Sequence, residues 1–253
     1  MKRIFTRCVY WFMVFSVFAL SCQEPKKEEA VKKEKVKDGL FVSHFKNGKV
    51  KQEIPMKDGK QNGLAKEYYQ DGKLAKEIEY KNGVKDGFVK QYYENGKIAF
   101  HQNYKNGKQH GKQERFKEDG NLWSVSYFVE DEPCKGLVEY TSKNEPRKKY
   151  PNIVVQPVNN LYKNGTYALN LSMSDKTRAV EFYIGDLDKN GCIDWTNVEY
   201  VLKEKSSSVA TLDFQMPQGT FIMKTINIIA KVKTLQGNYY ITERKYNVSV
   251  EFN

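Results

Sequence analysis

A 24-residue repeat of glycines most constrains what this 253-residue chain can fold into. Each unit opens with a glycine, at Gly39, Gly63, Gly87 and Gly111. Further glycines follow nine and 20 residues later, each preceded by Asn or Asp, in seven pairs: Asn47-Gly48, Asp58-Gly59, Asp71-Gly72, Asn82-Gly83, Asn95-Gly96, Asn106-Gly107 and Asp119-Gly120. Both central residues of a type I′ turn need positive φ, which Asn, Asp and Gly tolerate best. The spacing therefore predicts two short strands per unit with type I′ reversals at both ends.

Six tyrosines at repeated positions are candidate binding residues. They are the pairs Tyr68-Tyr69 and Tyr92-Tyr93 ahead of a turn, and Tyr80 and Tyr104 at the ends of alternating apolar segments. Alternation places neighbouring rings on opposite faces of an antiparallel meander. Such a ribbon has little interior, so one aromatic face is expected to stay exposed and to bind a partner. The alternative is that the rings hold the strands together through cross-strand pairs.

These units resemble the MORN-variant repeat family, whose signature is G-x-x-x-x-Y-Y-x-[ND]-G-K. Residues 63–73 and 87–97 match the signature, residues 39–49 and 111–121 match it in part, and a degraded fifth unit begins near Gly136. The resemblance covers about residues 39–145. It implies a β-hairpin array used for binding and scaffolding, and some members of the family are antitoxins. It implies no catalysis.

The N-terminus is typical of an exported lipoprotein. A basic start precedes the apolar run Cys8–Leu20, which has the length of a signal-peptide core and is too short to span a bilayer. The run ends in Ala-Leu-Ser-Cys, which resembles a bacterial lipobox, so we expect residues 1–21 to be a signal peptide and Cys22 to be acylated. An ordinary secretory signal is the alternative. The Lys/Glu-rich residues 22–38 then form a tether between the membrane and the body of the protein.

The lipobox resemblance also implies a location. Gln23 follows the cysteine in place of the Asp that retains many lipoproteins at the inner membrane, which favours the outer membrane. Residues 27–29 are similar to a Lys-acidic-acidic signal that directs some lipoproteins to the outer surface.

Residues 150–253 lack the 24-residue period and read as a separate domain. Seven strand-like segments are separated by Pro, Gly, Asn and Ser: Ile153–Val155, Thr166–Met173, Ala179–Ile184, Val198–Leu202, Val209–Phe214, Phe221–Thr234 and Asn238–Phe252. This rhythm predicts an immunoglobulin-like β-sandwich by pattern only, because the Cys…Trp…Cys signature is absent. The fold class is therefore all-β, with a meandering β-hairpin repeat array followed by a sandwich.

One loop of this second domain is a candidate calcium site. Its side-chain ligands would be Asp186, Asp188, Asn190 and Asp194, with Cys192 contributing its carbonyl, at a spacing that resembles an EF-hand or dockerin loop. Asn197 stands where a bidentate Glu belongs. The alternative is a polar hairpin turn, since Asp, Asn and Gly are also turn residues.

Two unacylated cysteines remain after export, Cys134 and Cys192, and both a bridge between them and two separate buried thiols are compatible with the sequence. The chain contains no CxxC, HExxH or G-x-S-x-G motif, so we expect no enzyme. The net charge is 42 − 31 = +11, but basic and acidic residues are interleaved along the repeats. A nucleic-acid partner, which would need a concentrated basic stripe, is therefore not expected.

The sequence thus favours a non-enzymatic envelope lipoprotein that binds a protein or glycan through its repeats and contacts the membrane through its lipid anchor. Two alternatives are an immunity or antitoxin-type protein that sequesters a toxin domain, and a glycan-binding or glycan-processing surface protein.

Overall fold

A computed structural model describes residues 37–177, 179–202 and 208–253. The described chain is all-β apart from one helical turn, which confirms the predicted fold class in outline. None of the described helical residues forms a helix with the length and apolar character needed to cross a bilayer.

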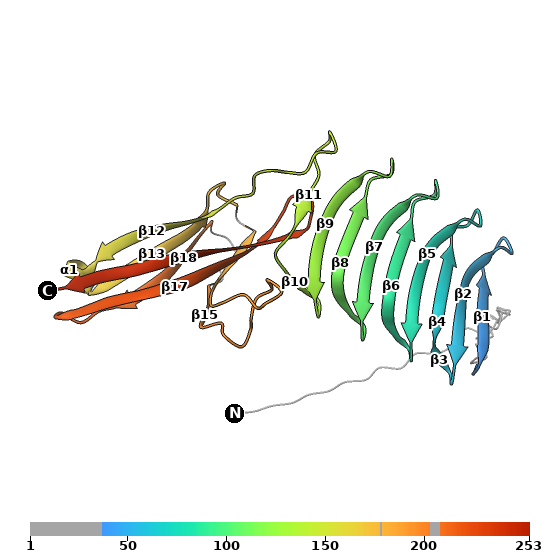
Figure 1. Ribbon diagram of the computed structural model, residues 1–253, viewed down its shortest axis with the longest axis horizontal. Helices are drawn as coiled ribbons and strands as arrows, with labels where there is room; N and C mark the ends of the chain where they lie inside the picture. Colours follow the sequence, from blue (N-terminus) through green and yellow to red (C-terminus); the bar gives the residue numbers. More distant parts are fainter. Residues whose placement is uncertain (1–36, 178, 203–207) are drawn as a thin grey trace, which may run out of the picture. The chain divides into compact units, whose positions relative to one another are not determined.

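The repeats form one antiparallel sheet in which each strand pairs with the next along the chain (Figure 1). Its order is β1-β2-β4-β5-β6-β7-β8-β9-β10, with β3 on β2 and β11 on β9. The strands are β1 (Gly39–His44), β2 (Val50–Lys57), β3 (Lys60–Gln61), β4 (Gly63–Tyr68), β5 (Leu74–Lys81), β6 (Val84–Tyr92), β7 (Ile98–Lys105), β8 (Lys108–Phe116), β9 (Leu122–Val129), β10 (Glu132–Pro133) and β11 (Val138–Glu139). Short β10 and β11 take the place of the degraded fifth unit.

The seven reversals belong to two turn types, so the uniform type I′ prediction is right at three of them and wrong at four. At Asp58, Asn82 and Asn106, φ is 50°, 52° and 51°, and the glycine that follows each is also positive, as a type I′ turn requires. At the other four reversals only the glycine has positive φ.

Each of these four is a type I turn closed by a glycine bulge. In the first, the amide of Gly48 donates to the carbonyl of Phe45 at 3.0 Å and the amide of Phe45 donates to the carbonyl of Lys49 at 2.8 Å. The carboxamide oxygen of Asn47 accepts from the amide of Lys49 at 3.1 Å. The Asn or Asp therefore acts through its side chain at these turns, and does not adopt the left-handed backbone there.

One face of the sheet carries a row of buried side chains in direct cross-strand register. The row runs across β4 to β9 and consists of Ala65, Ile78, Val89, Gln102, Gln113 and Ser126. Its polar half is internally satisfied, since Gln113 Nε2 donates to Gln102 Oε1 at 2.9 Å and Ser126 Oγ donates to Gln113 Oε1 at 3.2 Å. This row, which we call the buried row, supplies the interior that the single sheet otherwise lacks.

The second domain consists of two antiparallel sheets packed face to face. One has the order β12-β13-β16 and the other β15-β14-β17-β18. The strands are β12 (Ile153–Asn160), β13 (Thr166–Met173), β14 (Val180–Ile184), β15 (Tyr200–Leu202), β16 (Val209–Gln215), β17 (Thr220–Lys233) and β18 (Tyr239–Phe252). All seven predicted strands are present, and the immunoglobulin-like assignment within this two-sheet arrangement stays a prediction.

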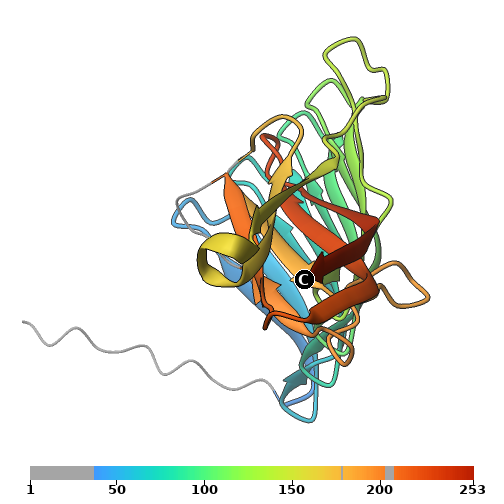
Figure 2. The same cartoon turned by 90° about the vertical axis from the view of Figure 1, so that its left-hand side faces the viewer.

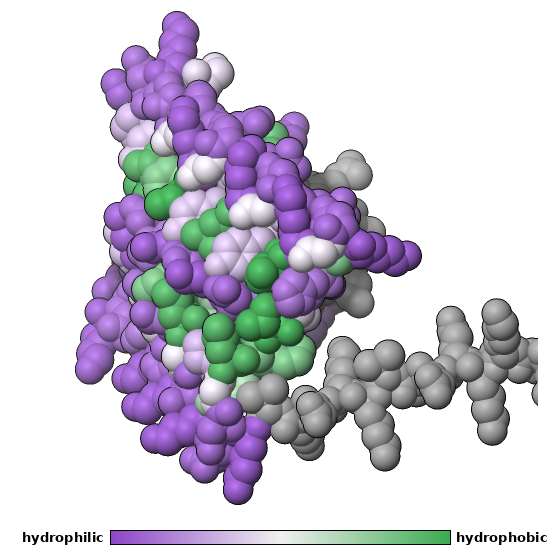
Figure 3. Space-filling model, turned by 90° about the vertical axis from the view of Figure 1, so that its right-hand side faces the viewer, coloured by the Kyte–Doolittle hydropathy of each residue, from purple (hydrophilic) through white to green (hydrophobic). Residues whose placement is uncertain are grey.

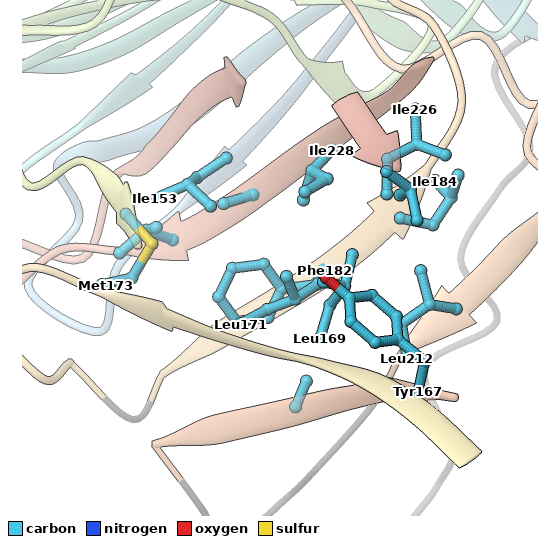
Figure 4. Packing of buried hydrophobic residues seen from close by; sticks show 14 of the residues in the cluster. Ile153, Tyr167, Leu169, Leu171, Met173, Phe182, Ile184, Leu212, Ile226 and Ile228 are labelled. Carbon is cyan, nitrogen blue, oxygen red and sulfur yellow. The ribbon is translucent and has the colours of Figure 1, made fainter. Parts of the chain in front are cut away.

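Both sheets of the sandwich contribute to one apolar core. Leu169 and Leu171 of the first sheet meet Phe182 and Ile228 of the second, and each is at most 1% exposed (Figure 4). The short helix α1 (Leu161–Asn164), which the sequence does not foretell, lies with the end of β18 at one end of the sandwich (Figures 1 and 2).

A disulfide joins the end of the repeat sheet, just after β10, to the sandwich. Cys134 and Cys192 are bridged across 58 residues of sequence, which resolves the alternative of two separate thiols. Beside the bridge, Lys135 Nζ donates to Glu243 Oε1 at 2.6 Å. The disulfide and this ion pair therefore each join a residue at the end of the repeat sheet to a residue of the sandwich.

A buried carboxylate reinforces the same junction. The side chain of Glu139 on β11 is 1% exposed and accepts hydrogen bonds from three groups. They are Arg147 Nη1 at 3.1 Å, Thr234 Oγ1 at 2.5 Å and Asn238 Nδ2 at 2.9 Å. The Thr234 and Asn238 side chains flank the β17–β18 turn, so this turn is held against the repeat sheet by charge-assisted hydrogen bonds.

Candidate binding surface

The face of the sheet opposite the buried row carries a row of charged and polar side chains, whose first four members alternate in sign. Neighbouring residues of a strand point to opposite faces, so Lys66 lies opposite Ala65 and Glu77 opposite Ile78. The residues stand in direct cross-strand register in the order Glu53, Lys66, Glu77, Lys90, His101, Glu114. We call this set the charged row. All six side chains are half-exposed, so they are accessible to a partner.

Alternation of sign stabilises the row itself. Each lysine stands between residues of opposite or neutral character, and opposite charges across strands contribute a few tenths of a kcal/mol to about 1 kcal/mol per pair. At one end, Glu114 Oε1 accepts from Lys112 Nζ at 2.6 Å, while Glu114 Oε2 lies 3.4 Å from His101 Nδ1. Lys90 Nζ lies 4.5 Å from the centre of the Phe88 ring, a cation–π contact.

Two of the predicted tyrosines belong to this face. Tyr68 Oη donates to Glu53 Oε2 and Tyr92 Oη donates to Glu77 Oε2, both at 2.7 Å. Burial and then the carboxylate partner raise the pKa of each phenol to about 12, so both hydroxyls stay protonated donors at physiological pH. Each hydroxyl reaches back to a glutamate 15 residues earlier and so links two units.

The other two tyrosines of the pairs reach forward. The hydroxyl of Tyr69 donates to the carbonyl of Tyr92, and that of Tyr93 donates to the carbonyl of Phe116 at 2.8 Å. Within each pair, therefore, one tyrosine is bonded to the preceding unit and the other to the following unit.

The six predicted tyrosines do not form one stripe. Tyr80 and Tyr104 share the parity of the buried row, and Lys85 Nζ lies 4.9 Å from the centre of the Tyr104 ring. All six rings are partly exposed, as are the side chains of the charged row, so burial does not distinguish a cross-strand role from a binding role. That these tyrosines bind a partner stays a prediction, and only Tyr68 and Tyr92 lie on the charged face to do so.

Sequence reasoning missed the charged row, although its signal was present. Glu53, Glu77 and His101 are spaced by 24 residues, as are Lys66, Lys90 and Glu114. The two series are brought together by the pairing of strands within and between units. A search for polar residues at the repeat period, parallel to the search for glycines, would have found them.

The loop predicted to bind calcium is a hairpin turn in the structure. The amide of Asp188 donates to the carbonyl of Cys192 at 2.8 Å and the amide of Gly191 donates to the carbonyl of Asp188 at 2.9 Å. This is the pattern of the glycine-bulge turns in the repeats. Asp188 Oδ1 also accepts from the amides of Asn190 and Cys192, at 2.8 and 2.9 Å.

The proposed ligands of this loop are engaged elsewhere. Asp194 accepts from Thr196 and Asn197, and Asp186 accepts from Asn227 Nδ2 at 3.3 Å. No group of three or more His, Cys, Asp or Glu side chains that could hold a metal ion occurs among the described residues. The loop forms the turn of the alternative interpretation and presents Cys192 to Cys134. That it also binds calcium stays a prediction.

The predicted acylation site, Cys22, lies outside the described residues, as do the signal peptide and nearly all of the tether. The last two tether residues are described and belong to the first repeat. The carbonyl of Lys37 accepts from the amide of Gly59 at 2.7 Å, and Asp38 Oδ1 accepts from the amide of Asp58 at 2.7 Å. The first unit thus begins two residues before the predicted boundary.

Comparison with known families agrees with this geometry. Residues 37–58, 61–82, 85–106 and 109–130 each match the family described as MORN repeat variant. The four matches are spaced by 24 residues and begin where the hydrogen bonds of the first unit begin. A comparison with curated proteins found none that matches this chain.

Proposed function

We propose, from the four MORN-variant repeats at residues 37–130, that the chain is a non-enzymatic binding module whose charged row docks a protein partner. The observation that carries the proposal is the alternation of sign from Glu53 through Lys66 and Glu77 to Lys90 across β2, β4, β5 and β6, which His101 and Glu114 extend as polar residues. With strands about 4.8 Å apart, the row spans roughly 24 Å. An extended segment or sheet edge with charges in the opposite order would match it.

Hydrogen bonds within the row hold its first glutamate side chains in fixed positions before a partner binds. Tyrosine hydroxyls from the next unit hold Glu53 and Glu77 in place, so little side-chain entropy remains to be lost when a partner binds. The lysines carry no such hydroxyl contact and are the residues that discriminate between partners. Electrostatic complementarity of this kind contributes to specificity and association rate more than to affinity.

The proposal includes export and anchoring. A lipobox-like segment before Cys22 and a Lys/Glu-rich tether support an outer-membrane lipoprotein that displays the repeats away from the bilayer. Replacing Cys22 by Ala is expected to abolish incorporation of a palmitate analogue and to release the chain from the membrane fraction. Unchanged labelling of the variant would contradict the anchoring.

The docking proposal is tested by neutralising lysines. A Lys66→Gln/Lys90→Gln variant and a control Lys81→Gln/Lys105→Gln variant lose the same charge, but the control lysines lie exposed at the β-turns, away from the charged row. Chemical cross-linking in intact envelopes is expected to yield a partner adduct with the wild type and the control. The first variant is expected to lose it while it stays folded, with a melting temperature lowered only by the loss of its cross-strand charge pairs. Equal loss in both variants would refute docking at the charged row.

A further inference from the structure

The first strand of the repeat sheet has an open edge. β1 pairs with β2 on one side, and no described strand pairs with its other side. The equivalent edges of β4, β6 and β8 are each paired with the preceding strand, in antiparallel order. β1 is thus the one described unit-opening strand whose usual neighbour is missing.

This edge lacks the features by which proteins protect open strands. Native edges usually carry Lys, Pro or inward-pointing charges that discourage pairing with another chain. β1 has the sequence Gly-Leu-Phe-Val-Ser-His, without Lys, Arg, Asp, Glu or Pro. Leu40 is 54% exposed and Val42 is 37% exposed. Figure 3 shows hydrophobic side chains gathered on this end of the sheet.

The first unit carries an apolar residue on β1 where the next two units carry a lysine. Val42 lies opposite Glu53, in the position that Lys66 and Lys90 occupy in the next two units. The charged row therefore ends at β1 in an apolar residue. A charged occupant of the open edge would meet no opposite charge there, whereas an apolar one would bury Val42.

We propose that the occupant is a second copy of this chain, paired through antiparallel β1 strands about a two-fold axis at Phe41. Such an interface is self-complementary, because each copy offers the same patch. Phe41 then faces Phe41 of the partner copy on one side of the joined sheet. On the other side, Leu40 of each copy faces Val42 of the other. Three apolar cross-strand pairs form and no charge is buried.

The pairing continues an interface that the array already uses. Between units, an opening strand is paired in antiparallel order with its neighbour, and the buried row crosses that boundary with Ile78 beside Val89. The β1–β1 pairing places Phe41 in the same role, since it stands opposite Ile54 on β2. Two repeat arrays become one continuous sheet, with a charged row from each copy.

The register is tested by disulfide capture in the full-length chain. Directly opposite residues have Cβ atoms about 4.5–5.5 Å apart, close to the span of a disulfide. Phe41→Cys is expected to give a covalent dimer in the oxidising envelope, seen on a non-reducing gel. Lys51→Cys, an exposed position on β2, is the matched control and is expected to give none. Leu40→Cys and Val42→Cys chains are expected to cross-link when co-expressed.

A second variant separates pairing from folding. Val42→Lys restores the lysine that faces Glu53 in the pattern of Lys66, so the repeat sheet should keep or gain stability. In the Phe41→Cys background it is expected to reduce the covalent dimer at least tenfold. A monomer in the Phe41→Cys chain, or an adduct with the mass of another protein, would overturn the proposal. Dimer formation unaffected by Val42→Lys would overturn it as well.

Discussion

Removal of the Cys134–Cys192 disulfide is the perturbation whose magnitude follows most directly from the structure. The bridge closes a loop with a sequence separation of 58 residues that includes β11 and the first half of the sandwich, from β12 to β14. In the chain-entropy description, a loop of that length lowers the entropy of the unfolded chain enough to contribute about 4 kcal/mol at 25 °C. Both sulfurs are buried, so Cys134→Ala/Cys192→Ala is the least disruptive replacement.

Two tryptophans allow the two domains to be followed separately. Trp123 lies on β9 with the Arg115 guanidinium 4.8 Å from its ring, and Trp195 lies against Tyr183 at 5.3 Å in the sandwich. Urea unfolding is monitored in chains that keep one of the two. With a slope near 3 kcal/mol/M, a loss of about 4 kcal/mol lowers the midpoint by roughly 1.3 M.

The wild type treated with a reductant is the control and is expected to reproduce the variant. The two tryptophan transitions should coincide in the oxidised wild type, since the Glu139 contacts and the bridge couple the domains. A midpoint shift below about 0.3 M, corresponding to about 1 kcal/mol, would refute the reasoning that the bridge constrains the unfolded chain. Two reactive thiols counted at Cys134 and Cys192 in the urea-unfolded wild type without reductant would show that they are not paired.

Three further outcomes follow from the turns and the junction. Gly72→Val is expected to lower the free energy of unfolding by roughly 1–3 kcal/mol in urea titration, because φ is 96° there. An added Cβ would meet only Lys49 Cδ at an ordinary 3.8 Å, and Gly72→Asn is the tolerated control. Calcium at 10 mM should leave the melting temperature unchanged, and Asp188→Ala should lower it, whereas a site with a Kd near ~1 mM would add about 1.4 kcal/mol. Hydrogen bonds from Lys135 and Asn227 lower the pKa of Glu243, so its contribution is present above pH ~4.3 and lost as pH falls through the lowered value. Glu243→Gln should therefore reduce the difference in melting temperature between pH 7 and pH 3.

The architecture was predictable because its cause is local and repeated. A glycine with positive φ every few residues and alternating apolar side chains specify strand, turn and pairing together. The turn types were predictable only in part. Asn-Gly occurs at Asn82-Gly83 with two left-handed residues and at Asn95-Gly96 with one, so the dipeptide alone does not distinguish them. At the Asn95-Gly96 turn, the carbonyl of Tyr93 accepts the hydrogen bond from the amide of Gly96 that closes the turn.

The junction could not be predicted, since it depends on residues far apart in sequence. The bonds of Glu139 reach Thr234 and Asn238, which are 95 and 99 residues away. No spacing rule connects them. The calcium prediction is not decided by spacing for a related reason: the same oxygens that bind an ion also cap a turn, as Asp188 Oδ1 does by accepting from the amides of Asn190 and Cys192.

The tyrosine contacts between units have a consequence for how such a protein can change over time. Tyr92 reaches 15 residues back and Tyr93 reaches 23 residues forward, so no hydroxyl of this kind extends beyond the adjacent unit. A whole 24-residue unit can therefore be duplicated or deleted without disturbing the contacts of the others. Each added unit would lengthen the sheet by two strand spacings, about 10 Å. Duplication or loss of whole units within the gene therefore changes the length of the sheet in fixed steps of one unit.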